Sequence, residues 1–503
     1  AALAFGEPES YPESQMKGVH LSAGLTQEAA VKRFNRSLGR AGRLVPEEGA
    51  EQVSVFARDT FDWRFFKRGV LLLEHPEGFS EYSFREERER VLDLDLSFEP
   101  GYPPKWAEPI VGPRAIVGVV RWTELRRAYR LEDDQAKCVG WADAIAPTAD
   151  LPFFGLQIEA LRGYEPECKE LASKAAGDEP TEAEHFYRKL LSLGGRVAGA
   201  YDQAVTLTLG PQLSLRDAYL ELFDYFLAVM EENRAGLVQR IDTEFLHDYR
   251  VALRRLRSVT SHMKSMMPQE LYHEISGALK ELFRTTGRAR DLDVLSLRRK
   301  EYTALLPEAL KPGVRVLFDR IDAETAASYE SLSARICSGA YQDRLENARS
   351  LLHRWSPTSW HQPWVLREAV GRWVRKRNRR ILSLLKLLDS GMADTQFHEL
   401  RVECKKLRYL LEIFGSLYPS EELQPVVKRL KKVQDVLGAQ QDLAVQQELL
   451  IEILETWGAD GAAVSAAIGG VLADFSRRSP KLRKRLKPEL RRFRRELSSL
   501  PGG

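Results

Sequence analysis

Residues 245–258 read FLHDYRVALRRLRS, and a second stretch at residues 397–410 reads FHELRVECKKLRYL. The two stretches align without a gap. His247 and His398 lie 151 positions apart, and the basic residues after them keep that spacing. The further pairs at this spacing are Arg250 with Arg401, Val251 with Val402, Arg254 with Lys405, Arg255 with Lys406, Leu256 with Leu407, Arg257 with Arg408, Lys280 with Lys431, Gly287 with Gly438 and Asp291 with Asp442. Agreement at one spacing over so long a stretch indicates an internal repeat.

Each stretch is expected to form an amphipathic helix that carries a basic ridge. At about 100° of rotation per residue, side chains at i, i+3, i+7 and i+10 fall within about 80° of one another. These positions hold His247, Arg250, Arg254 and Arg257 in the first copy and His398, Arg401, Lys405 and Arg408 in the second. The pairs Asp242-Thr243 and Asp394-Thr395 precede the two helices and can cap their first turns.

The first ridge has few acidic residues that could compensate its charge. No Asp or Glu occurs between Arg250 and Lys264, so ion pairs at i+4 cannot neutralise the ridge, and like charges at that spacing repel. Arg and Lys are the side chains that bind oxyanions, and neutral imidazole can still donate one hydrogen bond. A basic helix face is often only solvated, and a lone histidine is often structural. The repetition of the pattern nevertheless favours an anion-binding surface.

The segments HDYRVALRRLRS and HELRVECKKLRYLLEIF, followed by GRARDLDVL and LKKVQDVLGAQQDLAV, resemble the two halves of a CHAD domain, the conserved histidine α-helical domain. The resemblance covers residues 212–498 and implies an all-helical fold of two pseudo-symmetric bundles that binds inorganic polyphosphate in a basic channel or groove. The residues expected to contact phosphates are His247, Arg250, Arg254, Arg255, Arg257, Lys280, Arg372, Arg375, Arg379, His398, Arg401, Lys405, Lys406, Arg408 and Lys431. Arg255 and Lys406 are the least secure of this set, because each lies about 100° round the helix from its neighbour.

Length, charge and cysteine content limit the class of protein. A chain of 503 residues is long enough for two or more domains. Its net charge of +3 divides into +10 for residues 201–503 and −7 for residues 1–200, which indicates an anionic partner for the C-terminal part. The four cysteines, Cys138, Cys168, Cys337 and Cys404, have no metal-ligand spacing and fit reduced thiols. There is no apolar run of about 18 residues and no signal-peptide pattern, so we expect a cytoplasmic protein with no membrane partner. The CHAD resemblance implies that it can associate with polyphosphate granules.

The N-terminal part of the chain has a different character. Residues 1–16 are rich in Pro, Glu and Ser and are expected to form a disordered leader. Short β-type runs from about Val53 to Glu132 predict antiparallel hairpins. The segments ARDTFDWRFFKRGVLLLEH (57–75) and FGLQIEALRGYEPECKEL (154–171) resemble strands of a CYTH domain, the triphosphate tunnel fold, over residues 17–205.

Active CYTH domains open with a strand of alternating glutamates that hold divalent metals. Residues 16–25 offer Lys17 and His20 there but no carboxylate, and Glu159 on the later strand is followed by Ala160 and Leu161. Metal-assisted phosphoryl transfer needs converging carboxylates, so we expect a degenerate domain with no catalytic residues, metal or cofactor. The basic residues of its strands could bind an anion or simply lie on outer faces: Arg85, Arg88, Arg121, Arg126, Arg127 and Arg130.

The remainder of the chain is expected to be a series of helices. Apolar residues at helical spacing predict helices near residues 212–240, 243–266, 269–286, 289–306, 312–336 and 341–355, and again near 363–389, 395–417, 420–437, 441–457, 461–476 and 481–498. Gly287 is expected to end the third helix. The last helix carries eleven Lys and Arg, which we expect to surround it and to be mainly solvated; the alternative is that they contact the anion. It is also the feature best suited to nonspecific nucleic-acid binding.

The predicted fold class is therefore multi-domain. An α+β antiparallel CYTH-like domain (17–205) precedes an all-α domain of two pseudo-symmetric helical bundles (206–503, with halves near 212–356 and 363–498). The favoured function is non-catalytic binding of inorganic polyphosphate or another phosphate-rich polyanion. One alternative is a metal-dependent triphosphatase that acts through the N-terminal domain, and the other is a general polyanion or nucleic-acid binder. Single-stranded nucleic acid is disfavoured because the ridge lacks interleaved aromatic residues, and Tyr249 and Tyr409 fall away from it.

Overall fold

The computed structural model describes most of the chain. The described residues are 19–23, 27–76, 78–83, 88–92, 107–147, 153–175, 197–355, 365–388, 392–457 and 461–498, together with Arg188, Leu191 and Gly195. The chain divides into two compact units, Ala1–Gln203 and Ala204–Gly503. The expected leader at residues 1–16 and the residues Lys17 and Arg85 lie outside the described residues.

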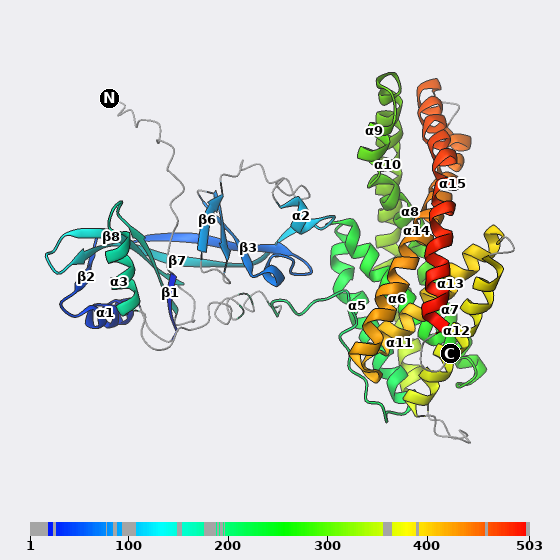
Figure 1. Cartoon of the computed structure of the whole chain (residues 1–503), viewed down its shortest axis with the longest axis horizontal. Coiled ribbons are helices and arrows are strands. Elements are labelled where there is room, and N and C mark those ends of the chain that lie inside the picture. Colours follow the sequence, from blue (N-terminus) through cyan, green and yellow to red (C-terminus); the bar gives the residue numbers. More distant parts are fainter. Residues whose placement is uncertain are drawn as a thin grey trace. The chain divides into compact units, whose positions relative to one another are not determined.

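The N-terminal unit is built on one antiparallel sheet (Figure 1). Its strands are β1 (Val19–Ala23), β2 (Gly42–Pro46), β3 (Glu51–Thr60), β4 (Val70–His75), β5 (Gly78–Ser83), β6 (Arg88–Leu92), β7 (Ile116–Asp133), β8 (Cys138–Pro147) and β9 (Phe153–Ala160). They follow the order β1-β9-β8-β7-β3-β4-β5-β6, and β2 also pairs with β7. Among these described strands β1 and β6 do not pair with each other, so the sheet is an open half-barrel. The predicted antiparallel α+β domain is confirmed.

The long strand β7 lies inside this sheet and connects its two parts. Its first part pairs with β3 and its last part with β8 and β2. Period-two burial along β3 places Val53, Val55 and Ala57 in a core beside Trp63 and Trp122, as expected for a strand with one buried face. A second core lies between β7–β9 and two helices, α1 (Gln27–Leu38) and α3 (Glu165–Ala175). The short α2 (Glu108–Val111) and η1 (Phe66–Arg68) complete the described elements.

The C-terminal unit is entirely helical in its described part (Figure 1). Its helices are α5 (Leu215–Val238), α6 (Thr243–His262), α7 (Gln269–Thr285), α8 (Gly287–Ser296), α9 (Arg299–Leu305), η2 (Glu308–Leu310), α10 (Lys311–Ile336), α11 (Gly339–Arg354), α12 (Leu366–Leu385), η3 (Lys386–Leu388), α13 (Asp394–Ile413), η4 (Gly415–Leu417), α14 (Ser420–Trp457) and α15 (Ala462–Ser498). This confirms the predicted all-α domain.

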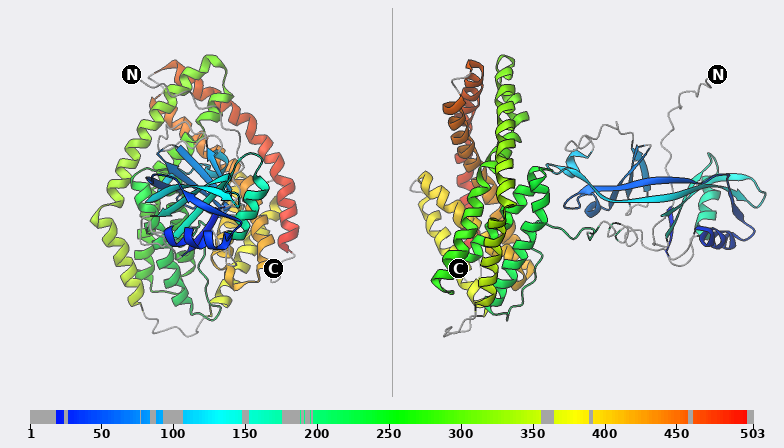
Figure 2. Two further views of the ribbon diagram at one scale, coloured as in Figure 1. Left: turned by 90° about the vertical axis from the view of Figure 1, so that its left-hand side faces the viewer. Right: turned by 180° about the vertical axis from the view of Figure 1, so that it is seen from behind.

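Among the described residues of the helical unit, two apolar cores involve the long helices α14 and α15. One is formed by α8, α9 and α10 with the adjoining parts of α14 and α15, and it contains Phe318 and Ile468. These elements project together at one end of the unit (Figures 1 and 2). The other core is formed by α12, α13, α14 and the last part of α15, and it contains Leu407 and Phe493. The long helices α14 and α15 therefore connect the two cores.

Several predicted helix boundaries were wrong. The single helix expected at 289–306 is divided into α8 and α9, and Gly287 begins α8 rather than ending α7. Conversely, α14 continues through Gly438 and α15 continues through Pro480, where breaks were expected. A proline removes one helical hydrogen bond, but the apolar side chains on both sides of Pro480 are buried, and their burial offsets that cost.

Candidate anion-binding site

The two repeated stretches form α6 and α13, which lie side by side. The Asp242 carboxylate caps α6 as predicted, accepting hydrogen bonds from the backbone N–H groups of Glu244 (2.8 Å) and Phe245 (3.2 Å). The cap predicted for the second helix was wrong, because α13 already begins at Asp394 and Ala393 occupies the N-cap position. There the Gln396 side chain accepts the Ala393 N–H at 2.9 Å, so a side chain inside the helix replaces the expected cap.

On α6, three guanidinium groups surround a single aromatic ring. The guanidinium carbons of Arg250, Arg254 and Arg257 lie 4.3, 5.7 and 4.6 Å from the centre of the Phe283 ring. All three are within the range of cation–π attraction. Arg250 is buried and donates to the Phe283 carbonyl at 3.1 Å and to the Thr286 hydroxyl at 2.5 Å. The end of α7 thus holds the cations of α6 in place. The spacing of residues in the sequence did not indicate that Phe283 belongs to this site.

On α13, the matching residues face the cations of α6. Arg254 donates to the Tyr409 hydroxyl at 3.3 Å, so this tyrosine lies beside the ridge, contrary to the prediction that it points away. Burial and the neighbouring charges of Arg401 and Arg254 lower the pKa of Lys405 to about 7. Burial likewise lowers the pKa of Arg401, and the charge of Arg254 adds to that effect. We define the basic cluster by its six cations, which are Arg250, Arg254, Arg257, Arg401, Lys405 and Arg408.

Most of the charge of the basic cluster is uncompensated. Within the described part of the chain, no carboxylate lies within 4 Å of Arg250, Arg254, Arg257 or Lys405. Burial, followed by the neighbouring charge of Arg254, lowers the pKa of Arg250 to about 10. A buried cation without a counterion is costly. This arrangement is therefore suited to an anion that would supply the missing charge.

Unfilled hydrogen-bond donors lead to the same conclusion. The Nε atoms of Arg250 and Arg401 are buried and have no hydrogen-bond partner among the described residues. Three carboxylates lie at the margin of the cluster, and one of them, Glu412, forms an ion pair with Arg408 at 3.3 Å. Asp442 is 3.9 Å from Arg401, and the charge of Asp291 acts on Arg250. These carboxylates are too few to balance six cations, so their role is to support individual arginines.

Several predicted site residues are engaged elsewhere. Arg255 forms an ion pair with Glu412 at 3.2 Å, and Lys406 forms one with Glu403 at 3.0 Å. The Nδ1 atom of His398 lies 2.9 Å from the Gln441 side-chain oxygen. The remaining predicted residues lie on α6, α7, α12 and α14. His247 is half-buried, and Arg372 lies 3.6 Å from Glu368. The exposed residues of this group are Lys280, Arg375, Arg379 and Lys431. The structure therefore brings six of the predicted residues into one cluster and gives Arg255 and Lys406 carboxylate partners.

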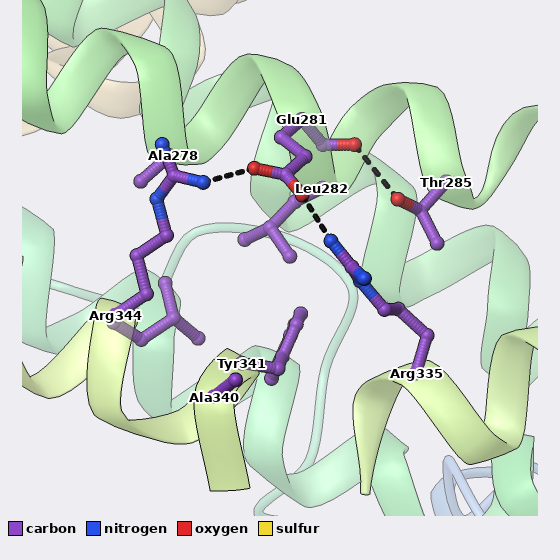
Figure 3. A pocket seen from close by; sticks show the side chains of 9 residues that line it. Ala278, Glu281, Leu282, Thr285, Arg335, Ala340, Tyr341 and Arg344 are labelled. Carbon is purple, nitrogen blue, oxygen red and sulfur yellow. Dashed lines mark hydrogen bonds and ion pairs between the residues drawn. The ribbon is translucent and has the colours of Figure 1, made fainter. Parts of the chain in front are cut away.

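A second gathering of cations is already neutralised. A cavity of 150 Å³ between α7, α10 and α11 is lined by Glu281, Arg335, Tyr341 and Arg344 among others. Figure 3 shows the Glu281 carboxylate between the two arginines, and it forms an ion pair with each. The hydrogen bond from Arg335 and the charge of Arg344 hold the pKa of Glu281 below its usual value. Because the protein supplies its own counterion here, this hollow is a weaker candidate for an anion site than the basic cluster.

The arginines of the N-terminal sheet are mostly engaged. Arg121 lies over the Phe56 ring at 4.9 Å, Arg126 contacts Glu124 at 3.1 Å, and Arg130 contacts Glu47 at 2.6 Å. Arg127 is exposed, and Arg88 lies on β6. Among the residues that the structure describes, no three His, Cys, Asp or Glu side chains gather in a way that could hold a metal ion. No helix in the same residues combines the length and apolar content needed to cross a bilayer.

Comparison with known proteins gives a family for the helical unit. Residues 221–451 match the sequence model of the family described as "CHAD domain". The crystal structure of the CHAD domain from the plant Ricinus communis is similar, with a TM-score of 0.50 and 25% sequence identity, covering 58% of this chain and 96% of that one. PptA from Streptomyces chartreusis has a TM-score of 0.44 and 13% identity, covering 56% of this chain and 100% of that one. A comparison with curated proteins found no match.

Proposed function

The helical unit of this chain is a CHAD domain, and we propose that it binds inorganic polyphosphate at the basic cluster between α6 and α13. The observation that carries this proposal is the meeting of six cations from two repeated helices, of which four have no carboxylate within 4 Å among the described residues. Arginine binds phosphate oxygens as a rigid fork and lysine as a mobile point charge. Polyphosphate is also the ligand that the family resemblance implies.

The repeat suits a linear polymer of phosphates. Matching positions on α6 and α13 carry matching cations, so we propose that the two copies contact successive stretches of one chain in a pseudo-symmetric manner. Each phosphate contact releases counterions, and affinity should therefore fall steeply as salt concentration rises. Arg250 supports this role because its side chain is already held by Phe283 and Thr286, so little conformational freedom is lost on binding.

We further propose that the N-terminal unit does not catalyse phosphoryl transfer. The sequence of β1, VHLSA, contains no carboxylate. Two buried glutamates of β7 are engaged by other side chains, because Glu124 accepts from Trp122 Nε1 at 2.8 Å and Glu132 accepts from Arg43 at 2.9 Å. Incubation of the full chain with tripolyphosphate and Mg²⁺ or Mn²⁺ tests this point, and release of phosphate above that of a buffer control would contradict it.

The polyphosphate site is tested by replacing Arg250, Arg254, Arg401 and Lys405 with Ala in the full chain. Each lost charge-assisted hydrogen bond costs about 1.5–3 kcal/mol, so affinity for long-chain polyphosphate should fall by at least about 100-fold. The dependence of the binding constant on salt should also become less steep. Circular dichroism and thermal unfolding show whether the variant folds, and the single Arg254→Gln variant serves if it does not. Normal polyphosphate binding by a folded variant would place the site elsewhere.

A further inference from the structure

Helix α15 carries a basic stripe on its exposed side. The stripe consists of Lys481, Lys484, Lys487, Arg491 and Arg495, all of which are exposed. At about 100° per residue these five positions fall within about 120° of one another. At 1.5 Å per residue the stripe is about 21 Å long. Five of the eleven basic residues that were expected to surround this helix therefore form one continuous face.

The other side of α15 is buried. Leu486, Leu490 and Phe493 are at most 1% exposed, and they share a core with Leu400 and Leu407 of α13. The stripe consequently faces away from α13 and from the basic cluster to which α13 contributes. Figure 2 shows α15 along the outer edge of the helical unit. The stripe and the basic cluster are two separate surfaces.

Four of the five cations of the stripe have no carboxylate partner among the described residues. In the described residues, no carboxylate lies within 4 Å of Lys481, Lys484, Lys487 or Arg495. The nearby Glu489 is already bridged to two cations of α14, Arg429 at 3.6 Å and Lys432 at 3.2 Å. These bridges place the first part of α14 next to the stripe.

We propose that the α15 stripe, with the exposed Lys428 of α14, binds the phosphate backbone of double-stranded nucleic acid. Basic residues clustered along one helix are the usual electrostatic footprint of such binding. Lys428 lies one turn before the bridged Lys432 on α14 and makes the surface two helices wide. A thin polymer such as polyphosphate would contact one row of basic side chains on this outward-facing surface. A duplex is broad enough to contact both α14 and α15.

The partner is recognised through its backbone and not through its bases. The aromatic residue of this part of α15, Phe493, is buried in the core and cannot stack on a base. Single-stranded nucleic-acid sites generally combine basic residues with exposed aromatic rings. A surface of lysines and arginines without such rings fits duplex phosphates, which are accessible without unpairing. Binding should therefore be independent of nucleotide sequence.

The test compares two triple variants of the full chain that change the net charge equally. One carries Lys484→Gln, Lys487→Gln and Arg491→Gln in the stripe. The control carries Lys264→Gln, Lys300→Gln and Arg315→Gln, which are exposed residues on other parts of the helical unit. Binding of a fluorescent DNA duplex of random sequence is measured at several salt concentrations, and binding of long-chain polyphosphate is measured on the same proteins.

The stripe variant should bind the duplex at least about tenfold more weakly, and its log–log salt slope should be lower by about three, one for each lost phosphate contact. The control should bind the duplex like the unaltered chain, and both variants should keep their polyphosphate affinity. Equal duplex binding by the stripe variant and the control would overturn the proposal. So would a loss of polyphosphate affinity in the stripe variant, which would identify the stripe as a polyphosphate surface. Because polyphosphate binding is measured separately, failure of this inference does not imply failure of the proposed polyphosphate site.

Discussion

The two repeated helices carry similar charges but hold them by different means. On α6 the arginines surround Phe283, and Arg250 is fixed by hydrogen bonds to the end of α7. The residue 151 positions after Phe283 is Gln434, which is buried and donates to the Cys404 carbonyl at 2.7 Å. The second copy therefore has no ring at this position, and the residue that replaces Phe283 stabilises the core.

A second difference concerns the charge itself. Arg254 on α6 corresponds to Lys405 on α13. A guanidinium stays protonated at any physiological pH, whereas burial and neighbouring charges lower the pKa of Lys405 to about 7. The comparison shows that a repeat can retain the places of its cations while one copy holds a permanent charge at this position and the other holds a charge that depends on pH.

The largest effect predicted from this contrast is on the pH dependence of polyphosphate binding. Lys405 is protonated below its pKa of about 7, and bound polyphosphate favours the protonated form. Affinity should therefore be highest below neutral pH and fall by about tenfold as pH rises from about 6 to 9, the value of roughly one charge-assisted hydrogen bond. Titration calorimetry over this range measures the change.

Lys405→Arg is the matched variant for this prediction, because arginine keeps its charge throughout the range. Its affinity should vary much less with pH than that of the unaltered chain, and the remaining variation belongs to the polyphosphate and other groups. An Arg254→Lys variant tests whether the two positions are equivalent. If Lys405→Arg and the unaltered chain show the same pH profile, Lys405 does not titrate at the site.

A smaller effect is expected from the aromatic ring. Phe283→Leu keeps an apolar side chain next to Arg250, Arg254 and Arg257 but removes the ring face. Cation–π contacts at such sites are worth about 0.5–1 kcal/mol each, so polyphosphate affinity should fall by about fivefold. The matching change in the second copy, Gln434→Leu, should lower the unfolding free energy by about 1 kcal/mol and leave affinity almost unchanged. Equal affinity losses in the two variants would remove the proposed distinction between the copies.

The sequence was sufficient to predict the two fold classes and the basic cluster. Helical spacing placed Arg250, Arg254 and Arg257 on one face, and the repeat identified Arg401 and Lys405 as their counterparts. Such predictions succeed because they depend on local periodicity, which the structure of one helix determines. The six clustered cations were all among the predicted residues, and they are those that both copies place at i+3, i+7 and i+10 from the histidine.

The contacts between helices could not be predicted in the same way. Phe283 lies 33 positions after Arg250, and no pattern in a single sequence shows that α7 returns to α6 at that point. Tyr409 was placed on the wrong side because only its own helix was considered, whereas the hydroxyl reaches Arg254 across the helix pair. The uninterrupted course of α14 and α15 was also missed, since it depends on the burial of their apolar faces in two shared cores.

The smallest effect is expected from Arg255 and Lys406, two repeated basic residues outside the six-cation cluster that have carboxylate partners. Arg255 is bound to Glu412 and Lys406 to Glu403, so neither charge is available to an anion without breaking an ion pair. Arg255→Ala and Lys406→Ala should each change polyphosphate affinity by less than about twofold and stability by about 0–1 kcal/mol, the usual value of partly exposed pairs. Direct binding and thermal unfolding of each variant measure both quantities. A tenfold loss of affinity in either variant would mean that polyphosphate displaces the carboxylate, and the site would then extend round the helix beyond the six-cation cluster.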